Sequence, residues 1–259
     1  LLAGLVFGGI SLWRGRYFVD DPAFNAQWVR TNPWTADGMV NTAKYLIEKG
    51  DYAAARSAAA RTLQVAPQVA NAHYNFGLAH YHLGDLDAAI AAYRRALSLN
   101  PRFDAHYNLG LALANAGETA LAEEHYRQAL ERDEAHVDAN YNLGLLLAGN
   151  GELEQALPFF RRAAALAPGD AESVYNLGVA LGRLGRHEEA EVAYRQALER
   201  EPGHLGSLFN LGVQMLQARR PGEAAACFRR LVALDPGDAQ ARRYLELASG
   251  LQAEGQAPR

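Results

Sequence analysis

Residues 103–136 read FDAHYNLGLALANAGETALAEEHYRQALERDEAH, and a block of this kind recurs along the chain. A fixed period of a few tens of residues is the signature of a repeat architecture, in which each block is one structural module. The glycine of an NLG string, or NFG in one copy, returns every 33 or 34 residues, at Gly77, Gly110, Gly144, Gly178 and Gly212. An earlier, weaker copy has Ala43 at the position of this glycine. The sequence therefore predicts six repeats, at 36–69, 70–102, 103–136, 137–170, 171–204 and 205–238.

Each repeat is predicted to contain two helices. In the first helix, apolar residues such as Leu109 and Leu113 recur at helical spacing. A glycine then ends this helix, because glycine adopts the left-handed conformation after a helix end without steric cost. The second helix has alanine at its middle and an aromatic residue four positions later in five repeats, at Tyr93, Tyr126, Phe160, Tyr194 and Phe228. A proline, which cannot extend a helix, closes five repeats, at Pro67, Pro101, Pro168, Pro202 and Pro236.

This order of small, large and turn residues resembles the tetratricopeptide-repeat (TPR) family over residues 36–238. The resemblance implies an all-α fold, a right-handed superhelix of six helix pairs whose stability comes from stacking. Residues 239–250 are predicted to form a polar capping helix, and residues 251–259 a flexible tail. The repeats depart from the pattern at a few positions: Ala43 and Ala59 in the first, Glu134 in place of a closing proline, Pro158 inside a second helix, and Arg219 in place of a turn glycine.

One asparagine per repeat is the main candidate for function. It stands two residues before the small residue, at Asn41, Asn75, Asn108, Asn142, Asn176 and Asn210. The TPR resemblance places this row on the inner, concave wall. An amide both donates and accepts hydrogen bonds, so a line of amides can pair with the backbone of an extended peptide of any sequence. The alternative is that each asparagine braces the adjacent repeat.

Acidic and aromatic residues accompany the asparagines. An acidic row lies four residues earlier and includes Asp37, Asp104, Asp138 and Glu172. These acids are interpreted first as stabilising helix N-termini, and second as reading donors on a bound chain. A tyrosine precedes several of the asparagines, at Tyr107, Tyr141 and Tyr175, and either faces the groove or packs between repeats. Besides the asparagines, the predicted peptide-binding groove therefore includes three acids and three tyrosines: Asp104, Asp138, Glu172, Tyr107, Tyr141 and Tyr175.

The composition argues against several other functions. The net charge of −4 is small, whereas nucleic-acid binding needs a concentrated basic surface. Cys227 is the only cysteine, and the eight histidines show no metal-ligand spacing, so neither a metal nor a cofactor is expected. No catalytic motif is present, so this chain is not expected to be an enzyme. The arginines late in the second helices are interpreted as a solvated outer face.

The first thirteen residues form an apolar run that ends at Trp13 and is followed by Arg14 and Arg16. The run is too short to span a membrane by itself, since spanning needs about 20 residues. It is interpreted as the end of a transmembrane helix, with residues 14–35 as a connecting segment. A trimmed signal peptide and a core helix of a globular protein are the alternatives.

An apolar span, an aromatic and acidic connector and then a TPR array together resemble the tail of multi-span, lipid-sugar-dependent mannosyltransferases. This resemblance implies a membrane-associated, extracytoplasmic scaffold that presents protein substrate to a catalytic part upstream. A single-span or soluble TPR adaptor without a link to glycosylation is the alternative, and two arginines after the span favour a cytoplasmic array. In both cases the expected partner is a protein or an extended peptide.

Overall fold

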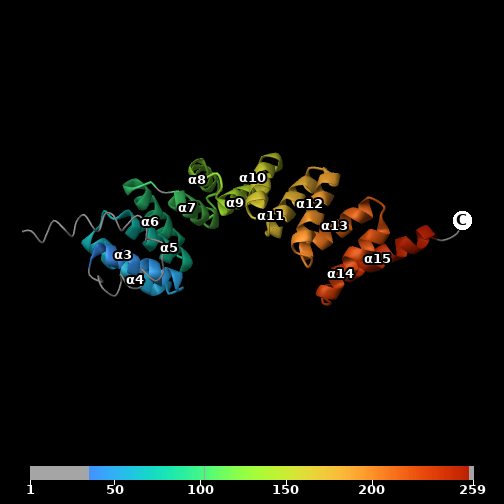
Figure 1. The fold of residues 1–259 in the computed structure, drawn as a ribbon, viewed down its shortest axis with the longest axis horizontal. Helices are drawn as coiled ribbons and strands as arrows, with labels where there is room; N and C mark the ends of the chain where they lie inside the picture. Colours follow the sequence, from blue (N-terminus) through green and yellow to red (C-terminus); the bar gives the residue numbers. More distant parts are fainter. Residues whose placement is uncertain (1–34, 102, 257–259) are drawn as a thin grey trace, which may run out of the picture. The chain divides into compact units, whose positions relative to one another are not determined.

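The computed structural model describes residues 35–101 and 103–256, and the side chains within that part except those at 103, 104, 255 and 256. These residues form thirteen α-helices and no strand (Figure 1). The predicted transmembrane end, most of the connecting segment and the last three residues of the predicted tail lie outside the described part. Among the described helices, none has both the length and the apolar character needed to cross a bilayer.

The helices occur in pairs, one pair within each predicted repeat. The chain divides into two compact halves, one reaching Ala129 and the other starting at Leu130, and each is described by itself. The first half contains α3 (Ala36–Glu48), α4 (Tyr52–Val65), α5 (Ala70–His82), α6 (Leu86–Leu99), α7 (Phe103–Asn115) and most of α8 (Thr119–Arg132). The second half contains α9 (Val137–Gly149), α10 (Leu153–Leu166), α11 (Ala171–Arg183), α12 (His187–Arg200), α13 (Leu205–Gln217), α14 (Pro221–Leu234) and α15 (Ala239–Gln256).

The contact between the two helices of a repeat depends on a glycine on one and an aromatic ring on the other. A Cβ atom placed on Gly178 would lie 2.7 Å from the ring of Tyr194, and one on Gly77 would lie 2.8 Å from the ring of Tyr93. The equivalent glycines at 110, 144 and 212 face their aromatic partners at the same separation. Because real Cβ atoms do not approach so closely, glycine is required wherever the second helix has an aromatic residue.

The first repeat confirms this coupling, because it lacks both the glycine and the aromatic residue. It has Ala43 in place of the glycine and Ala59 in place of the aromatic residue, and both are fully buried. Without a ring on α4, the α3 position has room for a methyl group. In the later repeats the rings themselves form the core, since Tyr93, Tyr126, Phe160 and Phe228 are almost completely buried. Burial raises the pKa of Tyr93 and Tyr126, and raises that of Tyr194 to about 12.

The turns inside the repeats follow the sequence except in the sixth. Gly50, Gly84, Gly117, Gly151 and Gly185 all have positive φ angles between 75° and 86°. Arg219 takes the same place between α13 and α14 with a φ of 57°, a left-handed conformation that is unfavourable for a residue with a Cβ atom. Pro158 lies inside α10, which nevertheless continues from Leu153 to Leu166.

The last helix is longer than the sequence predicted. α15 runs from Ala239 to Gln256, so residues 251–256 are helical and not part of a flexible tail. Its start is fixed by Asp238, whose carboxylate accepts hydrogen bonds from the backbone N–H groups of Gln240 and Ala241. Ala241 and Ala248 are fully buried, and α15 packs on α14 and α13 along this face. Gly250 lies inside this helix, and the α-helical backbone continues past it to Gln256.

Two glycines on one helix provide a matched test of the close contact. Gly178→Ala should destabilise the protein by about 1–3 kcal/mol, because the new methyl group overlaps the Tyr194 ring. Gly182→Ala, one turn later in α11, should be neutral or stabilising by up to about 1 kcal/mol, since its Cβ would meet no atom closer than 3.5 Å. Denaturant unfolding of both variants checks the prediction, and equal effects would contradict it.

Candidate functional site

The predicted asparagines lie on the first helix of each repeat, and several of their amide groups contact the preceding repeat. Asn108 Nδ2 donates to the Tyr74 hydroxyl at 2.9 Å. In the second half, Asn176 Nδ2 donates to the Tyr141 hydroxyl at 3.2 Å, and Asn210 Nδ2 donates to the Tyr175 hydroxyl at 3.3 Å. These hydrogen bonds join residues 34 or 35 apart in sequence. The asparagine therefore braces adjacent repeats, as one of the two sequence interpretations expected.

The asparagines are not equivalent in exposure. Asn75 is only 5% exposed and donates to the backbone oxygen of Val40, because the first repeat offers no tyrosine at the matching position. Asn41, Asn108, Asn142, Asn176 and Asn210 are half-buried. An amide whose nitrogen binds the scaffold still presents a carbonyl oxygen, so bracing and peptide binding are compatible. Peptide binding by this row stays a prediction.

The tyrosines beside the asparagines pack inside their own repeats. The rings of Tyr141 and Phe160 have centroids 6.3 Å apart, and those of Tyr175 and Tyr194 lie 6.1 Å apart. Tyr107 packs in the same way on Tyr126. Each ring is half-buried, and the hydroxyls of Tyr141 and Tyr175 reach the next repeat. The tyrosine therefore packs inside its own repeat and contacts the next one, and its exposure to a peptide groove stays a prediction.

The acidic row lies at the exposed starts of the first helices. Asp37 and Asp138 are exposed in the first turns of α3 and α9, where an acid stabilises the helix N-terminus. The side chain of Asp104 lies outside the described residues. Glu172 is exposed in the first turn of α11, and its carboxylate contacts His204 Nε2 at 3.2 Å. This contact joins the start of α11 to the residue that caps α13, the first helix of the next repeat.

The second half contains a cavity of about 330 Å³ between α11, α12 and α13. Sequence reasoning predicted only one member of its lining, Asn210. The apolar part comes from Val179 and Val213, the residues that follow the repeat glycines Gly178 and Gly212. The remaining lining is largely polar and consists of Gly182, Arg183, His187, Tyr194, Gln214 and Gln217.

A signal for the apolar part of this cavity was present in the sequence. Every repeat glycine is followed by Leu or Val, at Leu78, Leu111, Leu145, Val179 and Val213. None of these five side chains is buried, and Leu145 is 38% exposed. A partly exposed apolar residue at the same place in successive helices forms a row beside the amides. The candidate site of the second half therefore combines apolar contacts with amide donors and acceptors.

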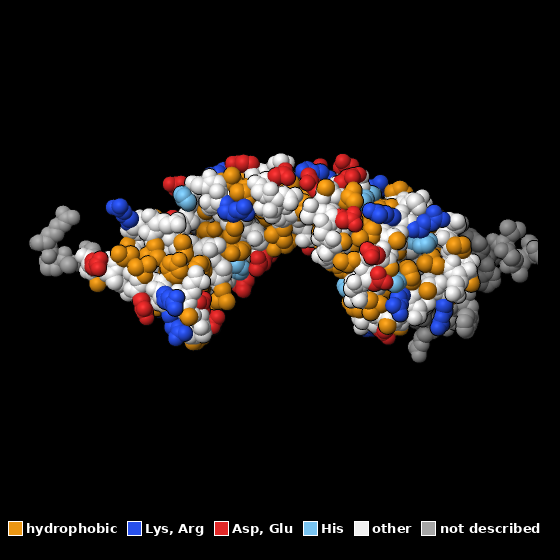
Figure 2. Space-filling model, turned by 180° about the vertical axis from the view of Figure 1, so that it is seen from behind, with side chains coloured by type: hydrophobic (Ala, Val, Ile, Leu, Met, Phe, Trp, Pro, Cys, Tyr) orange, Lys and Arg blue, Asp and Glu red, His pale blue; other side chains and the backbone are white. Residues whose placement is uncertain are grey.

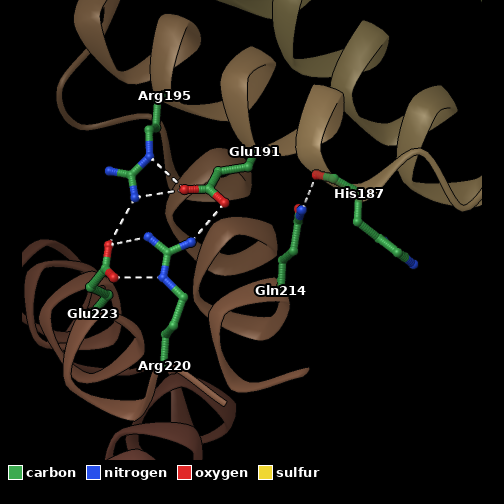
Figure 3. A network of polar contacts seen from close by, with 6 residues as sticks. All are labelled: His187, Glu191, Arg195, Gln214, Arg220 and Glu223. Atoms are coloured by element: carbon green, nitrogen blue, oxygen red, sulfur yellow. Dashed lines mark hydrogen bonds and ion pairs between the residues drawn. The ribbon is translucent and has the colours of Figure 1, made fainter. Parts of the chain in front are cut away.

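Ion pairs connect α12 with the start of α14 in the C-terminal repeats (Figure 3). Arg195 contacts Glu191 and Glu223, each at 2.9 Å, and Arg220 contacts Glu191 at 2.8 Å and Glu223 at 2.6 Å. Hydrogen bonds from Arg220 and Arg195 lower the pKa of Glu223. The four side chains satisfy one another between α12 and α14. Arg195 is therefore part of a neutral network and not of a basic patch.

Ser207, His204 and Glu172 are arranged in the order of a hydrolytic triad, but the burial excludes this use. Ser207 Oγ lies 2.8 Å from His204 Nδ1, and the backbone N–H of Ser207 donates to the same nitrogen. Ser207 is fully buried, so its hydroxyl has no access to a substrate. The histidine instead caps the N-terminus of α13. In the described part of the chain, no group of three His, Cys, Asp or Glu side chains is placed to hold a metal ion.

Two histidines of the third repeat form a contact that the sequence did not predict. His106 Nδ1 and His125 Nδ1 lie 3.1 Å apart between α7 and α8. One ring must donate and the other accept, so double protonation would place two cations in contact. Burial is the largest cause that lowers the pKa of His125; Arg94 also lowers it, while Glu124 and Gln128 act in the opposite direction.

Comparison with known proteins identifies the repeat. A family model described as tetratricopeptide repeat matches residues 40–104, 79–133 and 107–171, which together cover just over half of the chain. A model described as the middle TPR-like domain of cilia and flagella-associated protein 70 matches residues 149–256. No curated protein matches the chain.

Solved structures share the fold at low sequence identity. The chain is similar to YrrB, described as a TPR protein with an unusual peptide-binding site, with a TM-score of 0.65, 23% identity, and coverage of 73% of this chain and 97% of YrrB. A C-terminal part of a TPR protein from Cytophaga hutchinsonii gives a TM-score of 0.70 at 17% identity, covering 84% and 89%. A chain of the APC/C hetero-tetramer Cut9–Hcn1 gives a TM-score of 0.66 at 20% identity, and the match covers 89% of this chain but only 46% of that one.

The hydrogen bond between repeats can be tested by a double-mutant cycle on Asn176 and Tyr141. Asn176→Ala should lower the free energy of unfolding by about 0.5–1.5 kcal/mol, because it removes the donor to the Tyr141 hydroxyl. Tyr141→Phe should also destabilise, and the double variant should lose less than the sum of the two. Additive losses in denaturant unfolding would show that the two side chains do not act together.

The histidine pair should make the first half sensitive to acid. Because the folded pKa of His125 is lowered, the unfolded chain binds the proton more readily, and stability falls as the pH drops below about 6.5. Replacing His125 by Gln should reduce the loss of melting temperature between pH 7.5 and 5.5. His187→Gln, at an exposed histidine of α12 outside this contact, is the matched control for the loss of one imidazole, and an equal effect of both variants would contradict the prediction.

Proposed function

Since the chain belongs to the tetratricopeptide-repeat family, we propose that it is a protein-interaction scaffold that binds an extended peptide or a partner protein along its first helices. The observation that carries the proposal is the cavity between α11, α12 and α13, which brings apolar side chains and amides to one place. Val179 and Val213 would contact apolar side chains of the bound segment. Asn210 and Gln217 would pair with its backbone.

The composition of the cavity suits a peptide in particular. Its volume of about 330 Å³ lies at the lower end of the range for ligand sites, enough for one or two side chains of a bound segment. Asn210 and Tyr194 are held by contacts within the scaffold, so the orientation of these two side chains is set before a ligand binds. YrrB, which shares the fold, is described as having a peptide-binding site, and this supports peptide binding as a use of such an array.

Placement at a membrane is a separate part of the proposal. The apolar run before Trp13 supports a tether, with the array extracytoplasmic as the substrate-presenting tail of a glycosyltransferase. None of the similar structures named above is described as a glycosyltransferase, so this finer assignment rests on the N-terminal sequence alone. The competing proposal is a single-span or soluble adaptor for assembly of a complex, which the same cavity would serve equally well.

Replacing Val213 by Glu tests the cavity directly. The charged side chain should weaken binding of an extended, apolar peptide selected from a display library by at least about tenfold, because it places a carboxylate among apolar contacts. Fluorescence anisotropy with the labelled peptide measures the change. Circular dichroism and melting temperature establish that the variant is folded.

Val192→Glu is the matched control for this experiment. Val192 lies on α12, is 54% exposed and does not line the cavity, so the same substitution should leave peptide affinity unchanged. Equal affinity of the folded Val213→Glu variant and the unmodified chain would overturn the cavity as the binding site. Failure of every peptide to bind the unmodified chain would overturn peptide binding altogether.

A further inference from the structure

The outward face of α15 is apolar at its centre and has opposite charges at its two ends. Leu247 is 51% exposed and Leu251 is 42% exposed, one helical turn apart on the same side of the helix. Figure 2 shows hydrophobic side chains gathered near the C-terminal end of the described residues, at the left of the view. The buried face, with Ala241 and Ala248, points toward α14 and α13. The two leucines therefore leave about half of their surface uncovered by the repeats.

Charged residues bracket the leucines on the same face. Arg243 lies one turn before Leu247, and Glu254 lies almost one turn after Leu251. Both side chains are exposed, and within the described residues neither forms an ion pair. In order along the helix, the face thus reads positive, apolar, apolar, negative. Read from the other end of the helix, the same face has the opposite charge at each charged position.

A face of this kind is complementary to itself in the antiparallel orientation. When two copies of α15 lie side by side in opposite directions, Leu247 of one faces Leu251 of the other, and Arg243 of one faces Glu254 of the other. Both contacts occur twice, as a two-fold symmetric interface requires. Gly250 lies beside this face, and a Cβ atom there would meet nothing within 4 Å. Packing within the chain therefore does not require a glycine at this position.

We propose that the outward face of α15 is a homodimer interface, in which a second copy of the chain packs antiparallel through Leu247 and Leu251. The interface is distinct from the cavity of the proposed function and does not depend on it. Because the helix face is small compared with the interfaces of stable dimers, the association is weak and depends on protein concentration. Two oppositely charged pairs fix the orientation of the copies more than they add affinity.

Sedimentation velocity over a range of protein concentrations tests the dimer. The unmodified chain should show a monomer–dimer equilibrium, and Leu247→Glu should abolish it, since two carboxylates would replace the central apolar contacts. Circular dichroism establishes that the variant keeps its helices. A chain that remains monomeric at the highest soluble concentration would overturn the proposal, as would a folded Leu247→Glu variant that still dimerises.

Charge reversal tests the orientation. Arg243→Glu alone and Glu254→Arg alone should each weaken the dimer by about tenfold or more, because like charges then face each other twice. An equimolar mixture of these two variants should dimerise again, since each reversed residue meets an opposite charge on the other variant. Arg242→Glu is the matched control, because Arg242 is exposed on a different side of α15, and it should leave the dimer unchanged.

These variants distinguish self-association from other uses of the helix. Recovery in the mixture requires that Arg243 and Glu254 contact each other across the interface. If the mixture stays monomeric while the unmodified chain dimerises, the antiparallel pairing of α15 is wrong. If Arg242→Glu weakens the dimer as much as Arg243→Glu, the effect is one of net charge and the assigned face is wrong.

Discussion

The close contact between a glycine and an aromatic ring sets the geometry of every repeat after the first. A methyl group at Gly178 or Gly212 would lie 2.7 Å from the ring opposite, so the ring or the backbone would have to shift in a closely packed core. The first helix consequently lies directly on the ring of the second. The core of each repeat is therefore one aromatic side chain held between two backbones. This arrangement explains why Ala43 and Ala59 differ together from the other repeats.

Stacking of repeats depends on contacts of another kind. Tyrosine hydroxyls accept hydrogen bonds from the asparagine of the following repeat, as between Tyr141 and Asn176. In the C-terminal repeats, Arg195, Arg220 and their glutamates add a network of ion pairs between α12 and α14 (Figure 3). Polar bonds of this kind are directional, so they define the register between neighbours that apolar packing alone leaves loose.

The asparagines illustrate how a repeated residue can serve structure and recognition at the same time. Their regular spacing suggested a ladder of amides open to a peptide, and the structure places the nitrogens of Asn108, Asn176 and Asn210 in bonds to the scaffold. Such bonds hold the amide in one orientation before a ligand arrives. The leucines and valines beside them supply apolar area that the amides lack. Recognition of an extended peptide would use both, with specificity arising from the apolar contacts.

The sequence by itself determined the six-fold repetition and the pairing of helices in each repeat, because the recurring glycines, prolines and apolar spacings can be read along the chain. Only the tertiary structure decided which groups the amides bind, that His106 meets His125, that Val179 and Val213 border one cavity, and that α15 continues to Gln256. These features join side chains some 20 to 35 residues apart, or depend on what covers a surface. Stacking creates such neighbours, and no local spacing along the chain records them.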